Sequence, residues 1–423
     1  TKPFQFFLCH HKNGSGAYVR LLKMHLVEHP KVKTAVFVDS DNLDNLDRLF
    51  DYVGNDTGCL TVICTEELFT RPWCVGEMVT ARLKKVRVVL VQLPSAVLPD
   101  EPFIEELEDR ICNMEVLTEN GMSYQMIAET FHWIAHQPRI HMPSKCNPLV
   151  IGTLADRLAN KEETNVVEGS RSEGQRKDPR SSLLYDLSNM EAAATAYILK
   201  KLLLPLMSHE NDKLPEPLEG VELPEATQYI CVVCTNGTFE NPDTMKVLLQ
   251  VPQTHASLLP LICEQSFRFP AKDMSIQLQR SLPPGFSGND ANTIGMVIAA
   301  LFKEIAINFV AQHAGEAILK LAAEDVAKRL FSTKIKQTTS TRIISLGTAA
   351  SITKKTFSQK TVVSVGSRSD SGSKEVFLAQ VDTTSKEAYI STAAGSASES
   401  KTTLASSLPG RTEEHPYIWD LEL

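Results

Sequence analysis

Two segments decide the fold of this chain: Leu60-Thr-Val-Ile-Cys64 and, shortly after it, Thr70-Arg-Pro-Trp-Cys-Val-Gly-Glu-Met-Val79. The first is apolar and predicts a strand, whereas Pro72 favours a helix start because its ring presets φ and its missing N–H is not needed there. In that helix Trp73 and Glu77 lie four residues apart and are therefore neighbours. Open α/β sheets bind ligands where their strands end, so this strand and helix predict a functional site.

Strand and helix patterns alternate through residues 1–140. We predict strands at Phe4–Cys9, Ala35–Val38, Leu60–Cys64, Val86–Leu93 and Glu115–Leu117, and helices at Ala17–Val27, Leu46–Val53, Trp73–Lys85 and Ser123–His136. The Val86–Leu93 segment is continuously apolar, which is typical of a parallel strand covered on both faces. The alternation predicts an α/β fold with a doubly wound parallel sheet.

A second copy of the pattern follows the first. A shift of 170 positions places Val62, Cys64, Thr65, Phe69 and Pro72 on Val232, Cys234, Thr235, Phe239 and Pro242. The copy predicts strands at Leu183–Leu187, Tyr229–Cys234 and Leu258–Cys263 and a helix at Glu191–Leu204. We interpret this as a duplicated domain. Asp243 and Val247 replace Trp73 and Glu77, so the second copy keeps the scaffold without the acid.

These patterns divide the chain into a first domain (1–140), a linker (141–180), a second domain (181–330) and a tail (331–423). The linker prediction depends on the lapse of periodicity and on the polar run Arg171–Arg180. The tail is rich in serine and threonine and has no sustained apolar periodicity, so we expect it to be disordered. Within it, Thr361–Val365 is a candidate for transient strand pairing.

Composition argues against several classes of protein. Lys+Arg 43 against Asp+Glu 51 gives a net charge of -8, which disfavours a large cationic surface for nucleic acid. No apolar run approaches the ~20 residues that span a bilayer. The nine cysteines are scattered, and Cys231-Val-Val-Cys234 lacks the second ligand pair of a zinc site. We expect a cytoplasmic protein with no membrane span and no metal.

Three motifs follow one another in the first domain: Phe6-Phe-Leu-Cys-His-His-Lys12, Ala35-Val-Phe-Val-Asp-Ser-Asp-Asn-Leu43 and the W-C-x-x-E pattern of Trp73–Glu77. In this order they resemble the first strand, the second strand with its BB loop, and the acidic helix of the TIR (Toll/interleukin-1 receptor) domain family. The resemblance implies a flavodoxin-like five-stranded sheet for residues 1–140. The second copy, 181–330, resembles a degenerate TIR domain.

The same resemblance implies two functions. Many TIR domains hydrolyse NAD to nicotinamide and ADP-ribose or its cyclic forms, and others form signalling scaffolds through TIR–TIR interaction. By position, Glu77 matches the catalytic acid, and we place His11, Lys12, Gly14, Trp73 and Cys74 at the substrate. Asp39, Ser40, Asp41, Asn42 and Leu43 correspond to the BB loop, which mediates association. NAD would then be a substrate, no cofactor would be needed, and self-association is expected.

The residues themselves fit NAD cleavage in one respect. Nicotinamide leaves NAD as a neutral base, so no general acid is needed, while positive charge develops on the ribose. A single fixed carboxylate can stabilise that charge. Asn13-Gly-Ser-Gly16 could also present backbone N–H groups to a phosphate. A receiver-like domain using Asp39 and Asp41 is a further alternative, but it requires an aspartate where Cys64 and Thr65 stand.

Overall fold

The computed structural model describes residues 2–167, 179–208, 213–271 and 274–331, together with three short strands nearer the C-terminus. The described residues up to Phe331 belong to one compact unit, and the three strands nearer the C-terminus belong to another. The first unit contains both predicted copies. None of the helices in the described part of the chain combines the length and apolarity that a membrane span requires.

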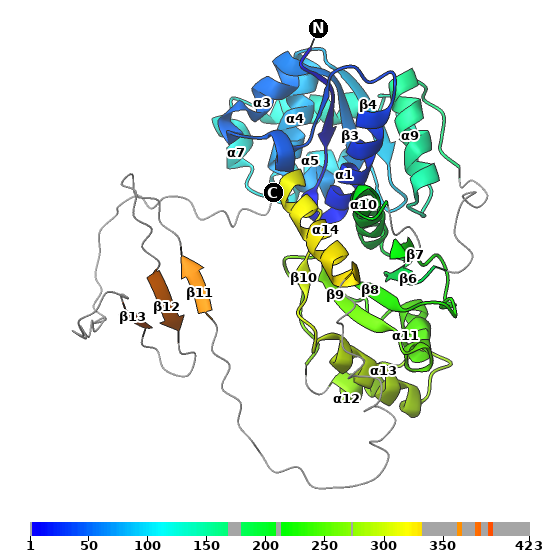
Figure 1. The fold of residues 1–423 in the computed structure, drawn as a ribbon. Helices are drawn as coiled ribbons and strands as arrows, with labels where there is room; N and C mark the ends of the chain where they lie inside the picture. Colours follow the sequence, from blue (N-terminus) through cyan, green and yellow to red (C-terminus); the bar gives the residue numbers. More distant parts are fainter. Residues whose placement is uncertain are drawn as a thin grey trace, which may run out of the picture. The chain divides into compact units, whose positions relative to one another are not determined.

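The first sheet is parallel and has the strand order β2-β1-β3-β4-β5. Its strands are β1 (Phe4–Cys9), β2 (Ala35–Phe37), β3 (Thr57–Cys64), β4 (Arg87–Gln92) and β5 (Arg139–His141). Apolar side chains of helices α1 (Lys12–Glu28) and α9 (Pro148–Asn160) cover one face. Helices α3 (Leu49–Asp51), α4 (Pro72–Leu83) and α8 (Tyr124–Ile134) lie on the other face (Figure 1), and their apolar side chains cover it. This strand order is that of flavodoxin-like proteins.

Short helical pieces complete the first repeat. They are α2 (Asp39–Asn42), η1 (Leu46–Arg48), η2 (Tyr52–Asp56), η3 (Leu68–Thr70), α5 (Glu101–Glu105), α6 (Leu107–Arg110) and α7 (Glu115–Glu119). Pro72 stands at the start of α4, as its fixed φ predicts. The turn η3 links the end of β3 to α4 and so holds the start of this helix near the carboxyl edge of the sheet.

The second sheet repeats the topology. It contains β6 (Ser181–Leu184), β7 (Glu216–Pro217), β8 (Tyr229–Cys234), β9 (Ser257–Ile262) and β10 (Ile307–Asn308), all parallel. Helices α10 (Met190–Leu206) and α14 (Glu316–Phe331) line one face, and α11 (Pro242–Thr254), α12 (Met274–Arg280) and α13 (Gly288–Leu301) the other. Its order, β10-β9-β8-β6-β7, is the first order read from the opposite edge. The predicted duplication of a doubly wound parallel sheet is therefore confirmed.

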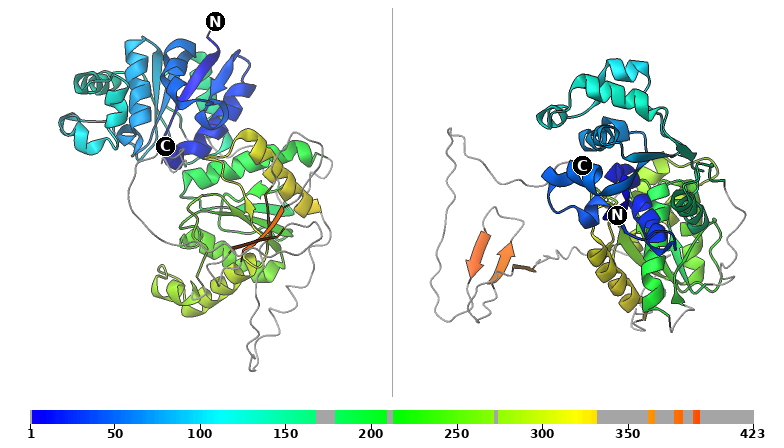
Figure 2. Two further views of the ribbon diagram at one scale, coloured as in Figure 1. Left: turned by 90° about the vertical axis from the view of Figure 1, so that its left-hand side faces the viewer. Right: turned by 90° about the horizontal axis from the view of Figure 1, so that it is seen from above.

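The two repeats pack against each other through helices. Helix α1 of the first repeat lies against α10 of the second, and α14 packs beside α10 (Figures 1 and 2). A single apolar core continues through this contact, from Leu8 and Leu22 to Leu199 and Val233. On the faces that meet here, the repeats therefore share one core.

Two predictions for the sequence between β4 and β6 were wrong. Glu115–Leu117 is not a strand but part of helix α7, where Leu117 is buried in the same core as α4; the fifth strand is Arg139–His141. The first part of the predicted linker contains helix α9, which begins after the Asn147 cap and buries Val150 and Leu154. Residues 168–178 of that linker lie outside the described residues.

Three strands are described in the segment that we expected to be disordered. They are β11 (Val362–Val365), β12 (Phe377–Val381) and β13 (Ala388–Ser391), and they form an antiparallel sheet. The segment singled out for strand pairing, Thr361–Val365, thus supplies β11. The remaining tail residues, 332–361, 366–376, 382–387 and 392–423, lie outside the described residues.

Candidate functional site

The candidate site lies at the carboxyl edge of the first sheet, between β1 and β3. The direction of the strand order reverses there, and doubly wound sheets bind ligands at such switch points. Cys9 is the last residue of β1 and Cys64 the last of β3. Glu77, in the second turn of α4, lies close to Cys9. The sequence motif therefore brings its acid to the expected edge.

Glu77 is a buried acid between two thiols. Only 6% of the residue is exposed, and its Oε2 atom has no hydrogen-bond partner. The ligand atoms of Glu77, Cys9 and Cys74 all lie within 4.8 Å of one another. Burial raises the pKa of Glu77 to about 8; a hydrogen bond from the Cys9 thiol opposes this rise, and the negative charge of Asp39 adds to it. At neutral pH the carboxyl group is therefore largely protonated.

The loop after β1 carries a charged cluster. Lys12 Nζ lies 3.1 Å from Asp39 Oδ2, and His10 Nε2 lies 3.8 Å from Asp39 Oδ1. Although burial opposes it, these two neighbours hold the pKa of Asp39 below its ordinary value. His11 Nδ1 lies 3.3 Å from Glu67 Oε2, but burial and the charge of Arg71 lower the pKa of His11 to about 4. His11 is therefore a neutral imidazole at physiological pH.

Four buried polar atoms without a hydrogen-bond partner lie at this edge. They are His10 Nε2, His11 Nε2, Thr65 Oγ1 and Glu77 Oε2. The two histidines follow β1, Thr65 follows β3, and Glu77 faces the end of β1. Orphaned polar atoms are uncommon in protein interiors, because each costs about 1–3 kcal/mol. Several of them at one sheet edge are a reason to expect a bound ligand there.

Trp73 and Cys74 have different surroundings. The Trp73 ring packs against Phe50, with the ring centroids 5.8 Å apart, and is half-buried. Gly76 permits this contact, because a Cβ atom there would lie 2.4 Å from Phe50 Cζ. Cys74 Sγ instead donates to the carbonyl oxygen of His10 at 3.4 Å. Cys74 therefore belongs to the Glu77 cluster, whereas the contact given for Trp73 is packing.

The expected phosphate-binding role of Asn13–Gly16 does not fit the structure. The backbone N–H groups of Gly14 and Ser15 both donate to the His11 carbonyl oxygen. Ser15 leaves helical geometry (φ -156°, ψ 19°), and Ala17 N and Tyr18 N, just beyond the loop, bind the Glu191 carboxylate at 2.7 and 2.8 Å. Two donors of the loop, Gly14 N and Ser15 N, are thus used within the chain, and Gly14 instead packs beside His11 and Thr65.

The predicted BB loop forms the short helix α2 and faces the second repeat. Arg20 pairs with both oxygens of Asp41 at 3.0 Å and donates to Ser40 Oγ at 2.8 Å. Asp41 also accepts the backbone N–H of Glu316 at 3.1 Å. Asn42 Oδ1 accepts a hydrogen bond from Lys23 Nζ, and Leu43 packs against the apolar core that contains the buried side chains of α4.

Sequence reasoning missed the residues that reach the site through tertiary structure. Cys9 is the clearest case: it ends a predicted strand, but its contact with Glu77 depends on which strands are adjacent. His313 of the second repeat is another, because its Nε2 atom lies 3.1 Å from Asn13 Oδ1. No local signal marks His313, since the two residues are 300 positions apart in the sequence.

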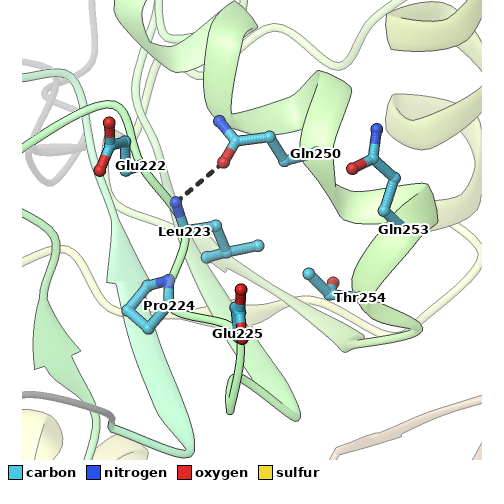
Figure 3. A pocket seen from close by; sticks show the side chains of 7 residues that line it. All are labelled: Glu222, Leu223, Pro224, Glu225, Gln250, Gln253 and Thr254. Carbon is cyan, nitrogen blue, oxygen red and sulfur yellow. Dashed lines mark hydrogen bonds between the residues drawn. The ribbon is translucent and has the colours of Figure 1, made fainter.

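A cavity of about 740 Å³ lies elsewhere, in the second repeat (Figure 3). Its lining residues are Glu222, Leu223, Pro224, Glu225, Gln250, Gln253 and Thr254. Gln250 Oε1 accepts the Leu223 N–H at 3.0 Å, which ties the loop to α11. The lining residues precede β8 and β9 in the sequence, so the cavity belongs to the amino edge of the sheet. Two carboxylates make it a poor site for a pyrophosphate.

Comparisons with known proteins do not assign a family. No protein-family model matches the chain, and no curated protein matches it significantly. Among solved structures, the chain is similar to Phytolacca americana UGT2 complexed with UDP-2fluoro-glucose and pterostilbene (11% identity, 81% of this chain and 98% of that chain, TM-score 0.21). A UDP-glucosyltransferase from Polygonum tinctorium gives 11% identity over 78% of this chain and 100% of that chain, with a TM-score of 0.20.

A third solved structure, from Clostridium novyi NT, is described as a tagatose-6-phosphate ketose/aldose isomerase. It gives 8% identity over 76% of this chain and 79% of that chain, with a TM-score of 0.19. Similarities at these TM-scores carry no argument about the function of this chain.

Proposed function

We propose that this chain is a TIR-type NAD glycohydrolase whose catalytic acid is Glu77. The observation that carries the proposal is the buried Glu77 carboxyl group, with an unpartnered oxygen, at the switch point between β1 and β3. The W-C-x-x-E resemblance supplies the substrate class. The second repeat has Val247 at the corresponding position, so the chemistry belongs to the first repeat.

The charge state of Glu77 suits a cationic substrate. In the free protein, burial keeps the carboxyl group largely protonated at neutral pH. A positively charged pyridinium ring beside it would favour the ionised form, because opposite charges attract strongly in a low dielectric. As the ring leaves as neutral nicotinamide, the positive charge moves to the ribose, and the same carboxylate stabilises it. The acid would thus be charged when the substrate is present.

The surrounding residues would exclude water and position the ribose. His11 is buried and neutral, so its imidazole adds no positive charge that would repel the pyridinium ring. Lys12 is paired with Asp39 and is the first residue of α1. The free Nε2 of His11 and the Thr65 hydroxyl are available to bind sugar hydroxyl groups.

The test is nicotinamide release from NAD by the full chain and by its Glu77→Gln variant. Glu77→Gln keeps the side-chain volume and removes the charge, and we expect the rate to fall by about 10²–10³. The matched control is Glu66→Gln, which removes an exposed acid from the loop after β3 and should leave the rate unchanged. Equal rates for wild type and Glu77→Gln would refute the assignment of the acid. No nicotinamide release by the folded wild type would refute the activity.

The second candidate function is a TIR signalling scaffold, and a different observation favours it. The predicted interaction segment already contacts the second TIR-like repeat, since Asp41 accepts the Glu316 N–H. Arg20 of α1, which pairs with Asp41, also donates to the carbonyl oxygens of Ala311 and Ala314. A scaffold predicts self-association that persists in Glu77→Gln, in the absence of nicotinamide release. Sedimentation of both proteins over a range of concentrations measures it, and a monomer at every concentration would contradict it.

A further inference from the structure

Two thiols and one carboxyl group converge beside the end of β1. Cys74 and Glu77 are three residues apart on α4 and so share one face of the helix, which they turn toward Cys9. In the part of the chain that the structure describes, these are the three residues whose potential metal-ligand atoms cluster within 4.8 Å. Cys9 is fully buried, and Cys74 and Glu77 are 7% and 6% exposed.

The three groups of the cluster can all become metal ligands by losing a proton. Glu77 Oε2 has no hydrogen-bond partner, although the Cys9 thiol hydrogen-bonds the Glu77 carboxyl group. The other thiol contacts are 4.0 Å from Cys9 Sγ to the Cys74 carbonyl oxygen and 3.4 Å from Cys74 Sγ to that of His10. Asp39 adds negative charge from α2, and Arg71 is the opposing cation near Cys74. A bound cation would stabilise the deprotonated forms of all three groups.

The second repeat offers an internal comparison. The register of β1 with β3 and of β6 with β8 places Cys9 opposite Val62 and Leu184 opposite Val232, which are equivalent positions. The shift that relates the repeats places Thr244 and Val247 at Cys74 and Glu77. The same scaffold therefore occurs in this chain with all three potential ligands replaced, so the fold itself does not require them.

We propose that Cys9, Cys74 and Glu77 bind one thiophilic divalent cation such as Zn²⁺. Thiolate sulfur and carboxylate oxygen are ordinary zinc ligands, and three protein ligands leave a fourth position for water. Binding displaces the protons of the thiols and the carboxyl group, and these protons leave to solvent. This site goes beyond the proposed NAD cleavage. The two compete for one residue, since a metal that holds Glu77 removes it from the ribose.

Cobalt(II) titration of the reduced, full chain tests the proposal. Cobalt replaces zinc and gives a thiolate-to-metal charge-transfer band only when sulfur is a ligand. We expect a band that saturates at one metal per chain and disappears when Zn²⁺ is added. Loss of an outer-sphere partner alone costs about 10–100-fold in metal affinity, so Cys9→Ser and Cys74→Ser should each weaken binding at least that much.

Two control variants separate this site from other thiols. Cys64→Ser removes an equally buried thiol from the same sheet, and Cys112→Ser removes an exposed thiol; both should keep the band. Circular dichroism confirms that each variant is folded. Absence of a band in wild type, or a band that survives in both Cys9→Ser and Cys74→Ser, would overturn the proposal. These outcomes do not depend on NAD, so the site and the proposed activity can fail separately.

Discussion

Glu77 and Glu191 are both buried acids, but their partners differ. Glu191 accepts hydrogen bonds from Ala17 N and Tyr18 N of the first repeat and from Gln312 Nε2 of its own repeat, so both of its oxygens have donors. Glu77 has an oxygen without any partner. Because burying a polar group without hydrogen bonds costs free energy, satisfied acids are usually structural, and unsatisfied ones suggest a ligand. The contrast assigns Glu191 to the contact between the repeats and Glu77 to the site.

Glu191 should make stability depend on pH. Burial raises the pKa of Glu191 to about 7, although its three donors oppose this rise. The folded chain therefore binds this proton more tightly than the unfolded chain does, so the contribution of Glu191 to stability is greatest at low pH and is lost as the pH rises toward 7. Relative to Glu191→Gln, the unfolding free energy of wild type should fall by up to about 1.4 kcal/mol per pH unit between about pH 5 and 7.

Urea unfolding of both proteins at several pH values measures this difference. Glu225→Gln, which removes an exposed acid of the same repeat, should follow wild type at every pH. A constant difference between wild type and Glu191→Gln across the range would contradict the expected titration.

At the scale of elements, helix α1 is shaped by its contact with the second repeat. The helix departs from regular geometry at Ser15, and this departure coincides with the binding of Ala17 N and Tyr18 N to Glu191. Gly16 lies at the same place. A Cβ atom on Gly16 would lie 2.9 Å from Gln312 Cα and 3.1 Å from its carbonyl oxygen. Because these are backbone atoms, they cannot move away as the end of a flexible side chain could.

Gly16→Ala should therefore separate α1 from the second repeat. We expect it to lower the unfolding free energy by about 1–3 kcal/mol, the usual cost of overpacking. The control is Gly152→Ala in α9, where the nearest atom, His25 Nδ1, would lie 3.7 Å away. Alanine there should be neutral or stabilising, because it favours helix over glycine. Thermal unfolding compares the two variants, and equal stability would show that the close contact is unimportant.

The elements that the sequence predicted well are those with a strong local pattern. Continuous apolar runs predicted β3, β4, β8 and β9, and Pro72 with the following apolar face predicted α4. The three-residue strand β5 is too short to have a periodicity, and the prediction placed the fifth strand at Glu115–Leu117 instead. Helix α9 had a detectable signal, with Asn147 as cap and Val150, Leu154 and Leu158 at helical spacing.

The candidate site was predictable only in part, for the same reason. The motif marked Glu77 and Cys74, and their neighbourhood on one helix face follows from their spacing. Cys9 enters through the adjacency of β1 and β3, and His313 enters through the packing of the repeats. A single sequence carries no local signal for the adjacency of two strands or for the packing of two repeats. The sequence predicts that the loop with Gly14 and Gly16 binds phosphate, whereas in the structure the two glycines allow close contacts within the protein.

At the scale of the whole molecule, both repeats belong to one cooperative structure. The apolar core on the α1 side of the first sheet continues through α10 and α14 to the second sheet. Polar contacts follow the same route, from Arg20 to the carbonyl oxygens of Ala311 and Ala314. The opposite faces of the two sheets have cores of their own, and Glu77 lies against one of them. Cys9 and Cys74 thus belong to the core on the opposite face of the first sheet from the shared core.

The shared core has a consequence for how such a chain can evolve. A duplicated domain usually keeps a surface that is complete on its own, so that gene fission can release either copy. Here α1 and α10 each present buried leucines to the other copy, among them Leu22 and Leu199. Splitting the gene between the copies would leave each half with an exposed apolar surface. The buried contact therefore makes each copy part of the other's folded core, whether or not the second copy has an activity of its own.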